Sequence, residues 1–184
     1  MVIEIRIHGR GGQGAQVAST MLAHAFHKGG RFVQAFAAYG GERRGAPVTA
    51  FVRVNDRPIR VRCEIRSPNY VLVFDPTLMT EVLTDIRPGA TLVVNSATTV
   101  PNVPPGVTVT LLDATSIARR HGLAPVVNSA MVGAFAGATS LISLEDVTWA
   151  ISETTPSRLE ANEAACTEAY WSLHPIEQAS GGRR

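Results

Sequence analysis

The sequence has little cysteine, a single lysine and no long apolar run, and these shortages exclude several classes of protein. Its two cysteines, Cys63 and Cys166, lie far apart without ligand spacing, so they indicate neither a metal site nor an iron–sulfur cluster on this chain. We expect both to be buried free thiols in a reducing cytosol. No apolar run reaches the roughly 18 residues of a membrane span, and Met1 leads directly into a strand, so we predict a cytoplasmic protein without a membrane or export segment.

Charge of neither sign dominates the chain. Its 17 basic and 15 acidic residues give a formal net charge of +2, which is too small to indicate nucleic acid as a partner. The length of 184 residues and the hydrophobic content of 45% fit one domain with a single core. We place that domain at residues 1–178, followed by a Gly- and Arg-rich disordered tail at residues 179–184.

What the sequence does contain is an apolar, strand-like run followed by a glycine-rich stretch from Gly9 to Gly14. Glycines at positions 9, 11 and 14 fit the G-x-G-x-x-G fingerprint of a strand, a tight turn and a helix N-terminus, where unpaired N–H groups attract an anion. The acidic residue that an NAD site needs about 20 residues later is missing, because residues 33–39 contain only Gln34 and apolar residues. Spacing alone leaves two alternatives, a tight turn without a ligand or a site for a phosphate-bearing cofactor.

A second glycine-rich stretch follows the strand that we expect at residues 31–36. It contains Glu42, Arg43 and Arg44 in a row and ends at Pro47. Two guanidinium groups among small residues can bind phosphate or carboxylate in bidentate geometry. A solvated charged turn is the simpler interpretation of the same residues.

Residues 48–54 and 58–62 are both rich in β-formers and flank an Asn-Asp turn, so we expect them to pair as an antiparallel hairpin. Arginines alternate with apolar residues along this region, which predicts one basic face, either solvated or in contact with an acidic partner. These arginines are Arg53, Arg57, Arg60, Arg62 and Arg66.

Three continuous apolar runs, at residues 70–75, 90–95 and 107–113, predict strands that are covered on both faces of a layered sheet. Helical patterns are found at residues 15–28, 77–83, 115–121, 131–141, 143–151 and 159–173. The sequence therefore predicts an α/β fold: a single layered domain with a mixed, mostly parallel sheet, helices on its faces and an antiparallel hairpin.

The helix expected at residues 131–141 has a face of glycine and alanine, and Asn128 or Ser129 can cap it. Small residues along a helix allow close packing against a sheet, another subunit or a cofactor, and packing within the domain is the simplest of these. His24 and His27 lie on the first helix without a second pair of ligands nearby, so we assign them no metal.

Three motifs, in this order, resemble the gamma subunit of the 2-oxoacid:acceptor oxidoreductases, of which pyruvate:ferredoxin oxidoreductase is the best-known member. The motifs are HGRGGQG at residues 8–14, QAF at 34–36 leading into GERRGAP at 41–47, and NSAMVGA at 128–134. The resemblance covers most of the chain and is weakest toward the C-terminus.

The resemblance implies a subunit of a catalytic complex that has no catalytic residue, no metal ligand and no cofactor bound by itself. In this family thiamine diphosphate lies between the alpha and beta subunits, [4Fe-4S] clusters lie in the beta and delta subunits, and the gamma chain covers the active-site entrance and helps bind coenzyme A. The complex converts a 2-oxoacid and coenzyme A to acyl-CoA and CO2, reversibly in some members. Its electrons pass to ferredoxin or to an NAD-reducing subunit.

The same resemblance implies that the glycine loop and the two neighbouring arginines contact the cofactor or coenzyme A, with Glu42 holding one arginine. Asn128 and Met131 are expected at a subunit interface or at the wall of the substrate channel. The expected cofactor-binding residues are Gly9, Arg10, Gly11, Gly12, Gln13, Gly14, Arg43, Arg44 and Asn128. Two alternatives stay open, a stand-alone nucleotide-binding α/β protein and a structural interface subunit without ligand contact.

Overall fold

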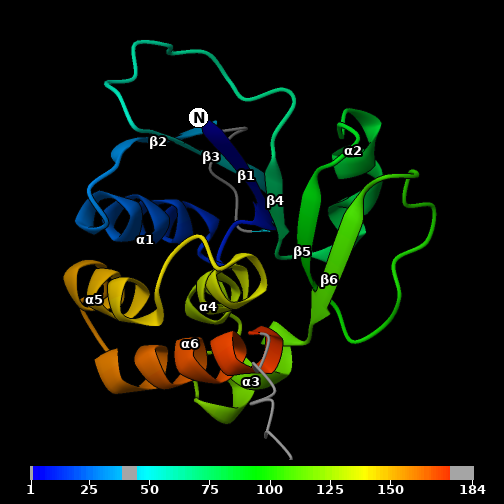
Figure 1. Ribbon diagram of the computed structural model, residues 1–184. Coiled ribbons are helices and arrows are strands. Elements are labelled where there is room, and N and C mark those ends of the chain that lie inside the picture. Colours follow the sequence, from blue (N-terminus) through cyan, green and yellow to red (C-terminus); the bar gives the residue numbers. More distant parts are fainter. Residues whose placement is uncertain (1, 39–44, 175–184) are drawn as a thin grey trace, which may run out of the picture.

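The computed structural model describes residues 2–38 and 45–174, which form a six-stranded sheet with helices on both faces (Figure 1). The strand order is β2-β3-β1-β4-β5-β6. The strands are β1 (Ile3–Arg10), β2 (Phe32–Ala38), β3 (Pro47–Asn55), β4 (Tyr70–Val73), β5 (Thr91–Asn95) and β6 (Thr108–Leu112). The helices are α1 (Ala15–Lys28), the 3-10 helix η1 (Pro76–Leu78), α2 (Met79–Thr84), α3 (Ala114–Arg120), α4 (Asn128–Thr139), α5 (Leu144–Thr154) and α6 (Leu159–Leu173). The layered α/β fold expected from the sequence is confirmed.

Among the described strands, only β3 runs against the common direction of the sheet. β1, β4, β5 and β6 pair in parallel, as the continuous apolar runs of the last three predict. β3 pairs antiparallel with both β1 and β2. The sheet is therefore mixed, with its antiparallel pairs at one side and its parallel pairs at the other.

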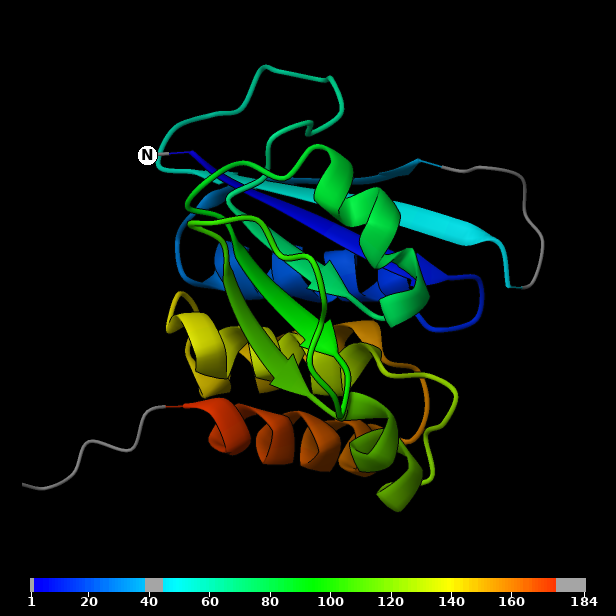
Figure 2. The ribbon, with the colours of Figure 1, turned by 90° about the vertical axis from the view of Figure 1, so that its right-hand side faces the viewer.

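The prediction that residues 48–54 and 58–62 pair as a hairpin is wrong. β3 has β1 on one edge and β2 on the other, so neither edge is left for residues 58–62, which form no strand. The antiparallel hairpin of this region joins β2 to β3 instead, and Pro47 is the first residue of β3, where proline is tolerated. Residues 56–69, called the 56–69 segment from here on, cross one face of the sheet without regular structure (Figure 2).

The first face of the sheet is covered by α1 and α4, with α5 and α6 packed outside them (Figure 1). Ile5 and Ile7 of β1, Met21 of α1 and Phe135 of α4 are fully buried in the main core on this face. Met131 is also fully buried there, so its expected place at an interface or channel wall is wrong, because its own domain surrounds it.

Helices α4 and α6 approach each other backbone to backbone. A Cβ atom at Gly133 would lie 2.2 Å from the carbonyl oxygen of Cys166, and one at Gly137 would lie 2.3 Å from that of Tyr170. Any side chain at either position would therefore push the two helices apart. The small-residue face of α4 packs within the domain, which is the simplest of the alternatives that the sequence left.

The second face of the sheet has a smaller apolar core, in which Val71 and Val73 of β4 meet Met79 and Val82 around α2. Toward β1 and β3 this face becomes polar, because Arg6 and Arg53 point into it. Only 5% of Arg6 and 3% of Arg53 is exposed. The prediction that the alternating arginines lie on one exposed basic face is therefore wrong for Arg53. Its guanidinium is buried beneath the 56–69 segment.

The two cysteines differ in their surroundings. Cys166 is buried in α6, where burial raises the pKa of its thiol to about 12. Cys63 is exposed on the 56–69 segment, so the expectation that both thiols are buried is wrong for this one. Neither forms a disulfide.

Candidate functional site

The connections that follow β1 and β4 leave the sheet on opposite faces. α1 follows β1 on the first face, whereas η1 and α2 follow β4 on the second (Figures 1 and 2). In an open α/β sheet such a change of side leaves a crevice at the carboxyl ends of the two strands, where ligands bind. The glycine loop, residues 9–14, follows β1 at this change of side.

The backbone of the glycine loop needs its glycines. Gly12 and Gly14 have φ values of 101° and 86°, which favour glycine strongly. A Cβ atom at Gly9 would lie 3.2 Å from that of Ala15 and 3.3 Å from that of Phe74, so this glycine allows the loop to pass close to β4 and α1. The loop thus delivers the chain in a tight turn to the start of α1.

Several N–H groups of the loop donate hydrogen bonds within the chain. The Arg10 N–H donates to Gln13 Oε1 at 2.8 Å, and the Gln13 N–H donates to the Arg10 carbonyl at 3.0 Å. The Gly11 N–H donates to the carbonyl of Ala46 at 2.9 Å. Within the described residues, no hydrogen bond uses the N–H of Gly12 or Gly14. These two are the loop donors that remain for a ligand.

α1 begins without a cap. Its N-cap residue is Gly14, in the left-handed conformation and without a side chain, and its first turn contains no acidic residue. The first N–H groups of a helix have no partner within the helix, and the helix dipole adds a partial positive charge there. The start of α1 is therefore suited to an anion.

Arg10 connects the ends of β1 and β4. Its Nε donates to Asp75 Oδ2 at 2.9 Å, its Nη2 to Thr77 Oγ1 at 2.7 Å and its Nη1 to the carbonyl of Gly45 at 3.1 Å. Burial raises the pKa of the Asp75 carboxyl, but hydrogen bonds from Thr77 and the charge of Arg10 outweigh burial and hold that pKa below its usual value. Arg10 thus joins the ends of β1 and β4 through an ion pair.

Asn128, at the start of α4, lies against the glycine loop. A Cβ atom at Gly14 would lie 2.9 Å from Asn128 Nδ2, and the N–H of Val127 donates to the carbonyl of Gln13 at 3.3 Å. The structure therefore brings together two motifs that are far apart in the sequence. Arg43 and Arg44 lie outside the described residues; Gly45, which follows them, donates its N–H to the carbonyl of Gly11 at 3.1 Å.

A cavity of about 350 Å³ opens beside Asn128 and the first turn of α1. Val17 of α1 and Asn128 line one side, and Arg158 and Asn162 at the start of α6 line the other. Arg158 has a φ of 54° and donates from Nη1 to the carbonyl of Gly122. No local motif marks Arg158 in the sequence, because only the packing of α6 against α4 brings it to this side of the domain.

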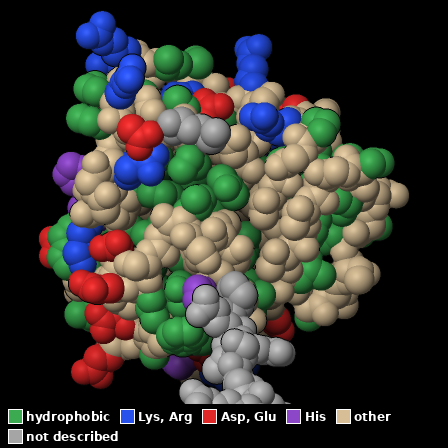
Figure 3. Space-filling model, in the orientation of Figure 1, with side chains coloured by type: hydrophobic (Ala, Val, Ile, Leu, Met, Phe, Trp, Pro, Cys, Tyr) green, Lys and Arg blue, Asp and Glu red, His purple; other side chains and the backbone are tan. Residues whose placement is uncertain are grey.

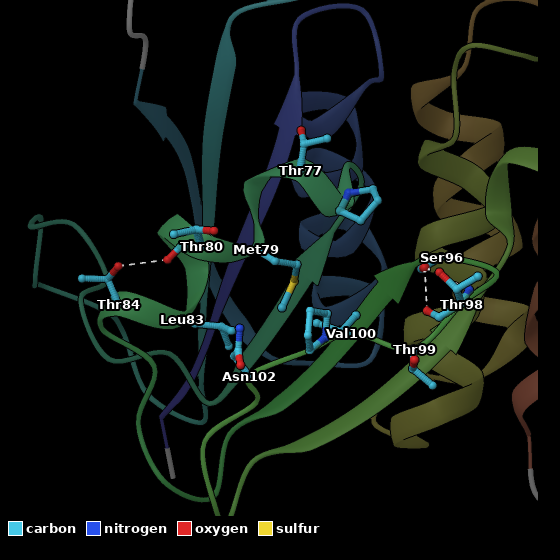
Figure 4. A pocket seen from close by; sticks show the side chains of 12 residues that line it. Thr77, Met79, Thr80, Leu83, Thr84, Ser96, Thr98, Thr99, Val100 and Asn102 are labelled. Atoms are coloured by element: carbon cyan, nitrogen blue, oxygen red, sulfur yellow. Dashed lines mark hydrogen bonds between the residues drawn. The ribbon is translucent and has the colours of Figure 1, made fainter.

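A larger cavity of about 550 Å³ lies on the second face, between α2 and the loop after β5 (Figure 4). Its lining contains Thr77, Thr80, Thr84 and Thr98 and no charged side chain. In Figure 4, Ser96 and Thr98 bind each other in a turn, through hydrogen bonds of 2.8 and 3.1 Å. The hydroxyl-rich wall of this larger cavity provides no charge for a phosphate. The cavity is therefore the weaker candidate site for a nucleotide-like ligand.

Among residues 2–38 and 45–174, no group of three or more His, Cys, Asp or Glu side chains could hold a metal ion. No helix in this part of the chain is long and apolar enough to cross a membrane. The candidate site is thus built from backbone N–H groups, an amide and guanidinium groups. Such groups bind anions.

Comparisons with known proteins show the family to which the chain belongs. A family model described as pyruvate ferredoxin/flavodoxin oxidoreductase matches residues 4–171. The chain is 45% identical over 178 residues to the pyruvate/ketoisovalerate oxidoreductases common subunit gamma of Thermococcus kodakarensis, a match that covers 92% of this chain and 96% of that subunit.

Two solved structures resemble the fold. The pyruvate oxidoreductase subunit PORC of Thermotoga maritima matches with a TM-score of 0.81 and 33% identity, over 92% of this chain and 96% of that chain. The 2-oxoglutarate:ferredoxin oxidoreductase of Magnetococcus marinus matches with a TM-score of 0.74 over 96% of this chain and 32% of that one. Its identity of 19% shows a shared fold alone. The family model and the first two relatives show that the chain belongs to the pyruvate ferredoxin/flavodoxin oxidoreductase family, as the gamma subunit of an oxidoreductase complex.

Proposed function

We propose that this gamma subunit helps bind coenzyme A at the active-site entrance of a complex that converts a 2-oxoacid and coenzyme A to acyl-CoA and CO2. The observation that carries the proposal is the uncapped start of α1 beside the cavity of Asn128 and Arg158. Coenzyme A carries phosphates, and these residues offer a helix N-terminus, free loop N–H groups and a guanidinium.

The fold neighbour from Magnetococcus marinus supports the proposal at the level of the fold. That enzyme has 2-oxoglutarate, coenzyme A and succinyl-CoA bound. The glycine loop of this chain supplies Gly12 and Gly14 as donors, whereas Gly9, Gly11 and Gln13 shape the loop and Arg10 joins its start to the end of β4. Arg43 and Arg44 are proposed to approach the same phosphates.

The thiamine diphosphate and [4Fe-4S] clusters of the complex are proposed to belong to its alpha, beta and delta subunits. The residues of this chain do not fit an iron–sulfur cluster, because Cys166 is buried and Cys63 lies on a different face without neighbouring thiols. Electrons would pass to ferredoxin or to an NAD-reducing subunit. The cytoplasmic location expected from the sequence stays a prediction.

The test is the substitution Gln16→Glu in the assembled complex. Gln16 is exposed in the first turn of α1, so the new carboxylate would repel a bound phosphate while interacting favourably with the helix dipole. We expect the KM for coenzyme A to rise about tenfold, a like-charge effect of about 1.4 kcal/mol, with the KM for the 2-oxoacid unchanged. A loss of stability could not produce this result, because the substitution favours the helix.

The matched control is Thr20→Glu, which adds the same charge one turn further along α1. It should leave the KM for coenzyme A within about twofold of the wild-type value, because its carboxylate would lie about 6 Å further from the phosphate, where solvent and salt weaken the repulsion. The substitutions Arg43→Ala and Arg44→Ala extend the test. If Gln16→Glu, Arg43→Ala and Arg44→Ala all left the KM for coenzyme A and the assembly of the complex unchanged, the chain would be a structural interface subunit without ligand contact.

A further inference from the structure

The 56–69 segment is held on the second face by two buried arginines. Arg53 donates from Nη2 to the carbonyl of Cys63 at 3.1 Å and from Nη1 to that of Val61 at 3.4 Å. Arg6 donates from Nη1 to the carbonyl of Arg66 at 3.4 Å. A buried guanidinium carries a large desolvation penalty unless it is paired and fully hydrogen-bonded. The fold thus uses two such groups to fix the backbone of an irregular segment.

Asn69 and Ile65, in the C-terminal part of the segment, are fixed as well. The Asn69 N–H donates to the carbonyl of Glu4 at 2.8 Å, and Asn69 Oδ1 accepts from the Glu4 N–H at 2.9 Å. Ile65 is buried, with 2% of its surface exposed. The outer side of the segment is therefore presented in one defined conformation.

The exposed charges of the segment are mainly basic, with four arginines against the two carboxylates of Asp56 and Glu64. The four arginines are exposed, and within the described part of the chain none of them forms an ion pair. These are Arg57, Arg60, Arg62 and Arg66. Figure 3 shows basic side chains beside apolar ones, with some acidic side chains among them, along the top of the molecule, where the 56–69 segment runs in Figure 1. Like charges fixed close together repel each other until carboxylates neutralise them.

An apolar cavity lies beside these charges. It measures about 350 Å³ and is lined in part by Val2, Pro58, Ile59 and Val61, with Arg60 among the lining residues. Val61 is 52% exposed and Val2 43% exposed. Protein interfaces are enriched in arginine around apolar positions, with hot spots where side chains fill pockets.

We propose that the basic patch, formed by Val2 and residues 57–66, binds an acidic surface of another subunit of the oxidoreductase complex. Carboxylates of that subunit pair with Arg57, Arg60 and Arg62, and one apolar side chain enters the cavity between Val2 and Val61. Charge complementarity selects an acidic partner, and the fixed backbone selects a rigid one, because a preformed segment loses little entropy on binding. The proposal is independent of coenzyme A binding.

The test measures how well the variant gamma subunit stays in the complex. Arg60→Glu and Arg62→Glu are each produced with the remaining subunits, and dissociation is followed by native mass measurement across a salt series. We expect each reversal to weaken retention of the gamma subunit about tenfold at low salt, with a smaller difference at high salt, where charges are screened. Arg60→Gln and Arg62→Gln should give intermediate losses, as charge pairing requires.

Arg119→Glu is the matched control, since Arg119 is exposed on α3, away from the basic patch. Its retention should equal that of the wild-type chain. Val61→Ser probes the apolar cavity without adding a charge, so it should weaken retention to the same extent at low and at high salt. Unchanged retention of the Arg60 and Arg62 variants would overturn the proposal. Normal assembly with slower transfer to the electron acceptor would also overturn it, because the patch would then bind the acceptor protein.

Discussion

The two faces of the sheet are stabilised in different ways, although β1 contributes alternate residues to both. Ile5 and Ile7 point into the first face, where apolar side chains and the close contact of α4 with α6 exclude water. Arg6 and His8 point into the second face, which they share with Arg53 of β3. One face is built from apolar area and the other from hydrogen bonds to buried charges.

The difference shows how an irregular segment can be part of a folded domain. Helices on the first face satisfy their own backbone groups, so apolar contact is enough to fix them. The 56–69 segment has no ladder partner, so its carbonyl oxygens need donors from elsewhere. Arg6 and Arg53 supply these donors, and they leave the outer side of the segment free for contact with a partner.

The largest effect should come from filling the contact between α4 and α6. In Gly133→Ala the new Cβ would lie 2.2 Å from the backbone oxygen of Cys166, and backbone cannot rotate away as a side chain can. We expect a loss of about 5 kcal/mol of unfolding free energy, or failure to fold. Urea unfolding followed by tryptophan fluorescence measures it, because Trp149 and Trp171 lie on α5 and α6.

Gly29→Ala is the control for this substitution. Gly29 has a φ of −71°, and the nearest atom to an added Cβ would lie at 3.4 Å, so alanine fits without strain. Its stability should stay within about 0.5 kcal/mol of the wild-type value. Equal stability of the two variants would show that α4 and α6 do not pack through their backbones.

On the second face, Arg53→Met should destabilise the chain by about 4 kcal/mol, because Glu4 would lose its buried partner and two carbonyls would lose their donor. Trypsin should then cut the 56–69 segment faster, since its exposed arginines would no longer be held. Arg60→Met is the control and should change stability by less than about 0.5 kcal/mol. A slow, unchanged tryptic cleavage of Arg53→Met would show that other contacts hold the segment.

The first face could be predicted from the sequence almost completely. The α6 prediction at residues 159–173 coincides with the observed helix, and the apolar runs gave the three strands β4, β5 and β6 within two residues at each end. Packing of α4 within the domain was also the favoured interpretation. These features depend on local periodicity and on residue size, and both are present in a single sequence.

The second face could not be predicted in the same way. Alternation along residues 48–54 suggested a solvent-facing Arg53, but β3 lies between β1 and β2, and the 56–69 segment covers it. The candidate site shows the same limit: the glycine loop was visible in the sequence, whereas the contact of Gly14 with Asn128 and the place of Arg158 depend on tertiary packing. Non-local pairing decides these positions, and local pattern does not record it.

His8 should make the second face sensitive to pH. Burial and the charge of Arg6 lower the pKa of His8 from 6.5 to about 4, although the charge of Asp85 raises it by a smaller amount. Between these values the unfolded chain binds a proton that the folded chain does not, so stability rises with pH there and falls as the solution is acidified. We expect the titration of His8 to lower the free energy of unfolding by about 2 kcal/mol between pH 7 and pH 5.

Urea unfolding at both pH values checks this expectation, with His8→Gln as the variant that removes the titration. The loss between pH 7 and pH 5 should be about 2 kcal/mol smaller in His8→Gln than in the wild-type chain. His27→Gln is the control for the substitution itself, because His27 is exposed at the end of α1, away from the second face. Identical slopes in all three chains would show that His8 takes up its proton in the folded state without penalty.

The smallest effect should come from charges on the first face. Lys28 lies 3.5 Å from Glu145, 3.4 Å from Asp146 and 5.3 Å from the ring centroid of Trp149, so it links α1 to α5 at the surface. Exposed ion pairs contribute little, and we expect Lys28→Ala to cost about 0.5 kcal/mol in dilute buffer and less in concentrated salt. Urea unfolding at two salt concentrations measures this. A loss of about 2 kcal/mol or more would erase the difference between the faces, because charge pairing would then stabilise the helical face as well.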